Sequence, residues 1–142
     1  HDFDYERYPD VAAQGHPVMG SNILRERGVS EEIIRAILSH ATEVTGVERV
    51  TDLEKALYAV DELTGLITAT ALVRPNKNIA DVSVSSVKKK WKDKAFAAST
   101  SRTEMELAAK EFGIELWEHV DNVIVAMRGI ASELGLEGNI AN

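Results

Sequence analysis

The chain has 142 residues, of which 44% are hydrophobic and 27% charged, and its formal net charge is −7. This length fits one domain with a buried core, and the composition disfavours disordered and fibrous classes. The absence of cysteine excludes disulfide scaffolds and thiol catalysis and fits a cytoplasmic location, while the acidic charge argues against nucleic-acid binding.

Helical patterns begin after a polar, turn-like segment. Pro17 suits the first helical position and Gly28 a left-handed cap, which predicts a helix over 17–27. Ser30 is expected to cap a second helix, because apolar residues recur at helical spacing from there to His40.

The longest apolar helix is predicted after a loop over 42–50. The sequence TDLE at 51–54 is a capping box that starts a helix over 52–73. Arg74 and Pro75 end this helix, because the residue before a proline avoids the helical region. No apolar run approaches the roughly 20 residues that cross a bilayer, so we expect no membrane partner.

The rest of the chain is expected to begin with a loop (76–85) and a basic helix (84–98). A short helix begins at the capping box SRTE (101–104) and ends at Gly113. A last helix (115–134) is ended by Gly135, and a frayed tail (138–142) follows. Strand signals are poor, since only Val82 and Val84 alternate with polar neighbours.

These patterns predict an all-α helical bundle that forms a single domain over 1–142. Residues 1–73 are expected to carry the metal-site helices, 74–135 the C-terminal helices and 136–142 the tail.

Three of the four histidines lie in the first forty residues, and imidazoles and carboxylates are the ligands that Zn, Mn, Fe and Ni ions prefer. Asp61 interrupts the apolar sequence of the long helix, where an uncompensated carboxylate is costly. The candidate metal ligands are His1, Asp2, His16, His40 and Asp61.

Each candidate ligand has a structural alternative. His16 could cap a helix, His40 could complement a helix dipole, and Asp61 could bond a neighbouring backbone group. His119, the fourth histidine, is interpreted as a surface or core-packing residue, and no function is assigned to it.

The order His-Asp, His, His, Asp resembles the HD superfamily of metal-dependent phosphohydrolases. More narrowly, the chain resembles a bacterial and archaeal family of predicted HD hydrolases whose substrates are not generally established. The similarity covers nearly the whole chain, through HDFDYERYPD, GHPVMGSNILRERGVSEEIIRAILSHA, LEKALYAVDELTGLITATALVRPNKNIADV and SVKKKWKDKAFAA. The last two segments are distinctive of the narrower family.

The resemblance implies an HD-type helical bundle that hydrolyses a small phosphate ester, such as a nucleotide, with one or two divalent ions (Mn, Fe, Ni, Zn or Mg). A divalent ion supplies this chemistry by lowering the pKa of bound water and polarising the phosphoryl oxygen. His16 and His40 are expected to bind a second ion. His1 and Asp2 are expected to bind the first ion or to bridge the two ions, and Asp61 to complete the ligand set of the first ion. Asp2 and Asp61 are the expected catalytic residues.

Further residues are expected around the ligands. Asp4 is a candidate for orienting a ligand imidazole from the second shell. Arg74 and Lys77 are the candidates for binding substrate phosphate, because both lie just beyond the helix that bears Asp61. The lysines of 88–94 have the same potential, although such a run is more often a solvated helix face.

HD proteins carry a further ligand histidine before the His-Asp pair, whereas nothing precedes His1 in this chain. We expect that the sequence has been cut or that another group completes the site. Missing helices would expose apolar faces and favour a homodimer. The alternatives are a dinucleoside polyphosphate hydrolase, which shares the five-position order, a non-catalytic metal- or nucleotide-binding module, and a purely structural bundle.

Overall fold

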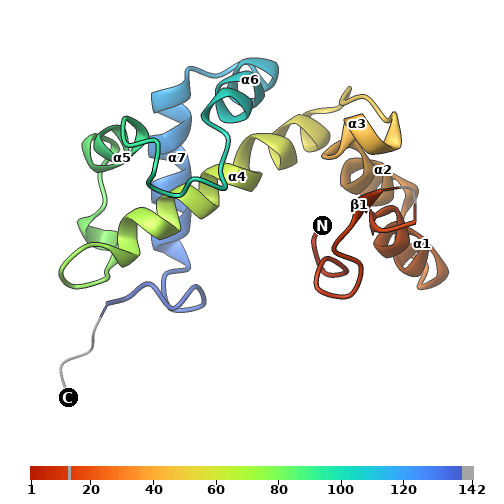
Figure 1. Cartoon of the computed structure of the whole chain (residues 1–142), viewed down its shortest axis with the longest axis horizontal. Helices are drawn as coiled ribbons and strands as arrows, with labels where there is room; N and C mark the ends of the chain where they lie inside the picture. The colour runs from red at the N-terminus through yellow and green to blue at the C-terminus, as the bar shows by residue number, and fades with distance from the viewer. Residues whose placement is uncertain (13, 139–142) are drawn as a thin grey trace. The chain divides into compact units, whose positions relative to one another are not determined.

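The computed structural model of the protein describes residues 1–12 and 14–138. The described residues form seven α-helices, one 3-10 helix and two strands of two residues each, so the predicted all-α class is confirmed (Figure 1). The chain divides into two compact units, His1–Tyr58 and Ala59–Asn142. The division falls inside one helix, α4 (Asp52–Leu72). The single domain expected from the sequence remains a prediction.

The first unit begins with a turn-rich segment and two short helices, α1 (Val18–Glu26) and α2 (Glu31–Ser39). Strands β1 (Val11–Ala12) and β2 (His16–Pro17) pair in parallel just before α1, in a segment where no strand was predicted. The predicted helix ends are close to the observed ones, and Gly28 follows α1 with a left-handed φ of 79°.

One detail of the predicted capping is wrong. Ser30 occupies the position before α2, but its side chain makes no capping hydrogen bond. Glu31 and Glu32 stand in the first turn of α2 instead, where their negative charges favour the positive end of the helix dipole.

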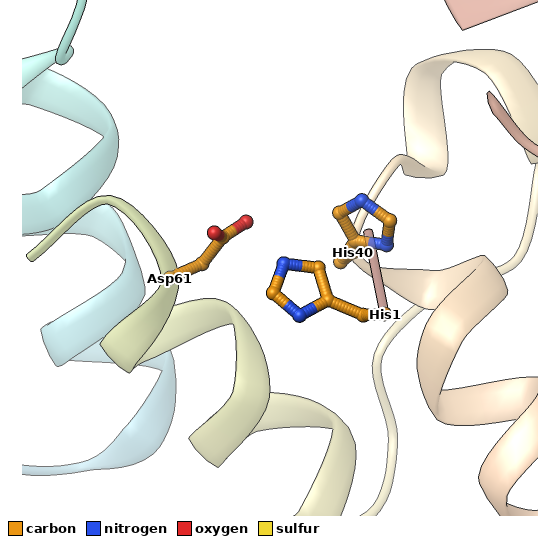
Figure 2. Close-up of side chains that lie close together, drawn as sticks. All are labelled: His1, His40 and Asp61. Atoms are coloured by element: carbon orange, nitrogen blue, oxygen red, sulfur yellow. The ribbon is translucent and has the colours of Figure 1, made fainter. Parts of the chain in front are cut away.

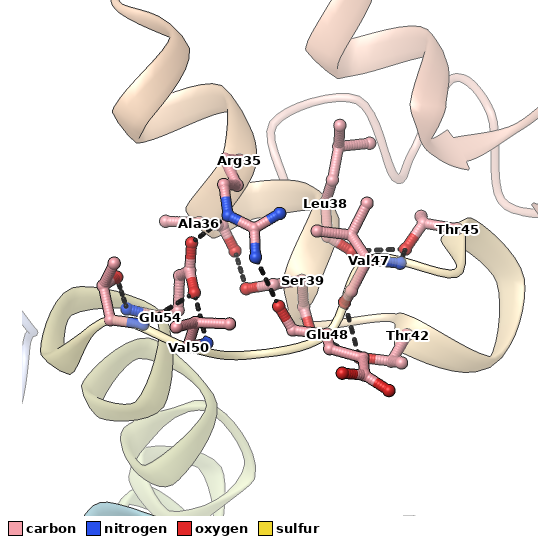
Figure 3. Close-up of polar contacts among 11 residues, drawn as sticks. Arg35, Ala36, Leu38, Ser39, Thr42, Thr45, Val47, Glu48, Val50 and Glu54 are labelled. Atoms are coloured by element: carbon pink, nitrogen blue, oxygen red, sulfur yellow. Dashed lines mark hydrogen bonds and ion pairs between the residues drawn. The ribbon is translucent and has the colours of Figure 1, made fainter.

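The predicted loop over 42–50 contains a short helix, α3 (Thr42–Thr45), which Gly46 ends with a φ of 69°. Polar contacts tie the following segment to α2 (Figure 3). The Arg35 guanidinium donates to the carbonyl of Glu48 and forms an ion pair of 2.8 Å with Glu54. This network fixes the C-terminal end of α2, which is where His40 lies.

The capping box that starts α4 is confirmed. The Glu54 backbone N–H donates to Thr51 Oγ1 at 3.3 Å, and the Thr51 N–H donates to Glu54 Oε2 at 2.9 Å. The same carboxylate accepts the Val50 N–H at 2.6 Å. One buried side chain on α4 therefore contacts both the segment at 50–51 and Arg35 of α2.

The second unit packs around the remainder of α4. Its other elements are η1 (Ile79–Asp81), α5 (Val84–Trp91), α6 (Arg102–Phe112) and α7 (Leu116–Gly129). The core draws on every one of these helices; its buried members are Leu63, Leu66, Ile67, Ala71, Ile79, Val82, Val87, Met105, Val120, Val123, Ile124, Met127 and Leu136. Among the described residues, no helix has the length and apolar character needed to cross a membrane.

Two predicted helices of the second unit are shorter than expected. α5 ends at Trp91 rather than at 98, because the Asp93 side chain accepts the backbone N–H groups of Ala95 and Phe96 and starts a separate turn. α7 ends at Gly129 rather than at 134, and turns continue to Gly135.

The second capping box is only half formed. Ser101 accepts the Glu104 N–H as predicted, and Gly113 ends α6 with a φ of 79°. The Ser101 N–H, however, donates to Glu62 on α4 at 2.6 Å instead of to Glu104. A tertiary contact therefore replaces the local one. Of the predicted tail, 139–142 lies outside the described residues.

Candidate metal centre

The His16 side chain is oriented by a buried carboxylate. His16 lies on β2 immediately before α1, and its Nδ1 atom is 2.8 Å from Oδ1 of Asp4. The other carboxylate oxygen of Asp4 accepts the backbone N–H of Gly20 at 2.7 Å. Asp4 is only 2% exposed and His16 3%. This is the arrangement that the sequence predicts for a residue that orients a ligand imidazole.

Gly20 is required for this contact, and sequence reasoning missed it. A Cβ atom at this position would lie 2.5 Å from Cγ of Asp4, which is closer than non-bonded carbons allow. Its N–H belongs to the first turn of α1, where backbone donors have no partner within the helix. The Asp4 carboxylate therefore accepts hydrogen bonds both from the N-terminal turn of α1 and from the His16 ring.

His40 approaches from the C-terminal end of α2. Its Nδ1 atom contacts the backbone carbonyl oxygen of Ile37, one turn earlier in the helix. The His40 ring lies 5.0 Å from the His1 ring between centroids and 5.1 Å from the His16 ring. Figure 2 shows the His1 and His40 rings side by side.

Three ligand atoms from three separate segments converge on one point. His16 Nε2 lies 3.1 Å from His40 Nε2 and 3.3 Å from Asp2 Oδ1, and the third side of this triangle, from His40 Nε2 to Asp2 Oδ1, measures 3.9 Å. Ligands held at about 2.1 Å from one ion are roughly 3.0–3.4 Å apart in octahedral and tetrahedral geometry. Two of the three distances lie in this range and the third is about half an ångström longer, so Asp2, His16 and His40 form a group that could hold a divalent ion.

The hydrogen-bond partners set the orientation of both rings. Nδ1 of His16 faces a carboxylate and Nδ1 of His40 faces a carbonyl, and both partners are acceptors. Each Nδ1 therefore acts as the donor, and Nε2 is the ring nitrogen that is left to bind a metal ion. The two Nε2 atoms meet a carboxylate oxygen of Asp2, which is a donor set that suits a divalent cation.

His1 extends the group on the other side of Asp2. Its Nε2 atom is 3.0 Å from Asp2 Oδ2, the oxygen that does not face His16. Asp2 could therefore serve two positions with its two oxygens, as the sequence predicts for a bridging carboxylate. Tyr5, which sequence reasoning did not single out, packs its ring edge against His16 at 5.4 Å between centroids.

Asp61, the fifth predicted ligand, is labelled in Figure 2 and lies on the part of α4 that belongs to the second unit. Since the other four predicted ligands belong to the first unit, the participation of Asp61 remains a prediction. Next to it, burial raises the pKa of Glu62, with the charges of Glu104 and Asp61 acting in the same direction.

The predicted phosphate-binding residues also belong to the second unit. Arg74 and Lys77 lie on the turn after α4, where the Lys77 N–H donates to the Arg74 carbonyl at 3.0 Å. Lys77 is exposed, and the Nε atom of Arg74 is buried without a hydrogen-bond partner among the described residues. In the basic run, Lys88 lies over the Trp117 ring.

The interpretation of His119 as a packing residue is confirmed. Its side chain is buried, with Nε2 2.9 Å from the Ala59 carbonyl and the ring against Phe112.

Comparisons with protein-family models, with curated proteins and with solved structures found no match to this chain.

Proposed function

We propose that this protein is a metal-dependent phosphohydrolase of the HD type that acts on a small phosphate ester, such as a nucleotide. The observation that carries the proposal is the meeting of two imidazole Nε2 atoms with a carboxylate oxygen, at Asp2, His16 and His40. The order of these residues along the chain, which resembles that of HD proteins, gives the reaction class.

A proton could balance the same three acceptors if one ring were an imidazolium. A metal ion is favoured because both Nδ1 atoms are already held by acceptors, so that the two Nε2 atoms are preorganised as ligands. Metal-ligating histidines almost always donate their other ring N–H to a carboxylate or a carbonyl, as His16 and His40 do here.

When bound, a divalent ion would supply a water of lowered pKa and polarise a phosphoryl oxygen. The residues of the chain have separate tasks. Asp2, His16 and His40 would hold the ion, Asp4 keeps the His16 ring in its orientation, and His1 shares the Asp2 carboxylate. Asp61 would complete the ligand set in this proposal, and Arg74 with Lys77 would bind substrate phosphate.

A panel of phosphate esters tests the proposal. The full chain would be incubated with nucleoside mono-, di- and triphosphates and dinucleoside polyphosphates, each with Mn, Fe, Ni, Zn or Mg, and phosphate release measured. We expect hydrolysis that a chelator abolishes and that His40→Ala reduces at least about a hundredfold, because a catalytic ion contributes several kcal/mol.

His119→Gln is the matched control, because it changes the histidine that lies outside the centre. Hydrolysis that is equal in the His40 and His119 variants, or that survives the chelator, would overturn the proposal. Metal binding without any turnover would support the non-catalytic module instead. Preferential cleavage of dinucleoside polyphosphates would select that narrower activity.

A further inference from the structure

A second candidate site lies in the second unit, between the end of α5 and the start of α6. It is a cavity of about 440 Å³ lined by Trp91, Lys92, Lys94, Thr100 and Arg102. Small-molecule sites usually have volumes of roughly 300–1,000 Å³. None of these five residues belongs to the metal centre, and Lys92 and Lys94 belong to the run of lysines that the sequence offers for binding phosphate.

The wall of this pocket is held in place by one guanidinium group. Arg102 donates to backbone carbonyls of the last turn of α5, at Lys90, and of the segment that joins the two helices, at Asp93, Phe96, Ala97 and Thr100. It also donates to Thr100 Oγ1 at 2.8 Å. Because these contacts fix the backbone of the joining segment, the pocket is preformed.

The pocket carries positive charge in a protein whose net charge is −7. Lys92 and Lys94 are exposed at its rim, and Arg102 forms part of its wall. Asp93 lies between the two lysines in sequence, but its Oδ1 atom accepts two backbone N–H groups of its own turn. Glu62 offsets part of the Arg102 charge. Two lysine ammonium groups are therefore available for an anion.

Trp91 gives the pocket an aromatic surface. Its ring packs edge-to-face on the Trp117 ring, with centroids 5.2 Å apart and an interplanar angle of 72°. This contact limits the rotation of the indole. A fixed aromatic ring beside cationic side chains is the combination that binds nucleotides without sequence preference, through base stacking and phosphate contacts.

We propose that this pocket binds a mononucleotide, with its base on Trp91 and its phosphate on Lys92 and Lys94. The inference goes beyond the proposed hydrolase activity and does not depend on it, since no pocket residue is a metal ligand or a phosphate-binding residue of the proposed hydrolase.

Isothermal titration calorimetry with AMP tests the phosphate contacts. The titration uses the full chain in the presence of EDTA, so that binding through a metal ion does not contribute. We expect Lys92→Ala/Lys94→Ala to weaken binding at least about tenfold, because each charge-assisted contact contributes substantially. The matched control is Lys89→Ala/Lys110→Ala, which removes the same charge from two exposed lysines of α5 and α6 outside the pocket.

Equal affinities of the two double variants, or no AMP binding by the wild-type chain, would overturn the proposal. Ribose 5-phosphate tests the aromatic contact, because it keeps the phosphate and lacks the base. We expect it to bind at least about fivefold more weakly than AMP, in line with the energy of stacking a base on an aromatic ring. Equal binding of the two ligands would contradict the role of Trp91.

Discussion

The imidazole of His16 and the carboxylate of Asp4 form a hydrogen bond of 2.8 Å in which both side chains are almost fully buried. This bond links the turn at the N-terminal end of the chain to the start of α1. Because Nδ1 of His16 is occupied, only Nε2 faces His40 and Asp2. The chemistry proposed for the centre depends on this orientation.

Asp4→Asn should weaken metal binding at His16 by about 10–100-fold, the usual cost of losing an outer partner of a ligand histidine. Asparagine has nearly the same shape but offers one acceptor oxygen instead of two. Titration with Zn or Mn, followed by calorimetry, measures the change. Glu6 is an exposed carboxylate of the same segment, so Glu6→Gln is the control and should leave the metal affinity unchanged. Equal affinities of both variants would remove Asp4 from the centre.

Gly20→Ala should destabilise the first unit by about 1–3 kcal/mol, because the added Cβ overlaps the Asp4 carboxyl group. Gly65→Ala is the matched control, since that helical glycine on α4 has nothing within 4 Å of an added Cβ. It should be neutral or stabilising by up to about 1 kcal/mol. Urea unfolding of both variants measures the difference. A Gly20 variant as stable as wild type would show that the close approach is not required.

Glu54 should make stability depend on pH. Burial by itself would raise the pKa of Glu54, but the N–H groups of Val50 and Thr51 and the charge of Arg35 together hold it below its ordinary value of 4.5. A lowered folded-state pKa means that the stabilisation is complete above pH 4.5 and is lost as the pH falls through the folded-state pKa.

Glu54→Gln should therefore cost about 1–3 kcal/mol at pH 7 and less at an acidic pH below 4.5, when measured by urea unfolding. Exposed Glu48, which contacts Arg35 only through its backbone carbonyl, is the control position for the same substitution. A cost for Glu54→Gln that is the same at both pH values would contradict this account.

Glu62 should show the opposite pH dependence. Burial is the largest cause that raises its pKa, so the folded protein retains a proton there more readily than the unfolded chain. The contribution of Glu62 to stability is then most favourable below pH 4.5 and decreases as the pH rises through the folded-state pKa. Glu62→Gln keeps an acceptor for the Ser101 N–H and should be more stable than wild type at pH 7. A loss of stability at pH 7 would show that the charge is favourable.

Helix positions were largely predictable because their signals are local. The capping box at 51–54 forms both of its hydrogen bonds, and Pro75 follows the end of α4 as expected. The box at 101–104 forms only one, because Glu62, 39 residues earlier in the chain, takes the Ser101 N–H. A contact at that separation leaves no local pattern.

The candidate centre was predictable in its residue types and not in its arrangement. The sequence identified Asp2, His16 and His40 as candidate ligands and Asp4 as a partner, and the structure brings these four together. The need for a glycine at position 20 could not be predicted, since it arises from the approach of α1 to Asp4 and looks like any helical glycine in sequence. The place of Asp61 stays a prediction.

The most direct test of the metal centre is the stoichiometry and affinity of divalent-ion binding to the full chain. The measurement combines elemental analysis of protein purified without chelators with calorimetric titration of Zn or Mn. We expect at least one ion per chain, with the affinity strongly reduced in Asp2→Asn, His16→Ala and His40→Ala and unchanged in His119→Gln. A wild-type chain that binds no ion, or a His16 variant that binds as tightly as the His119 variant, would contradict the account.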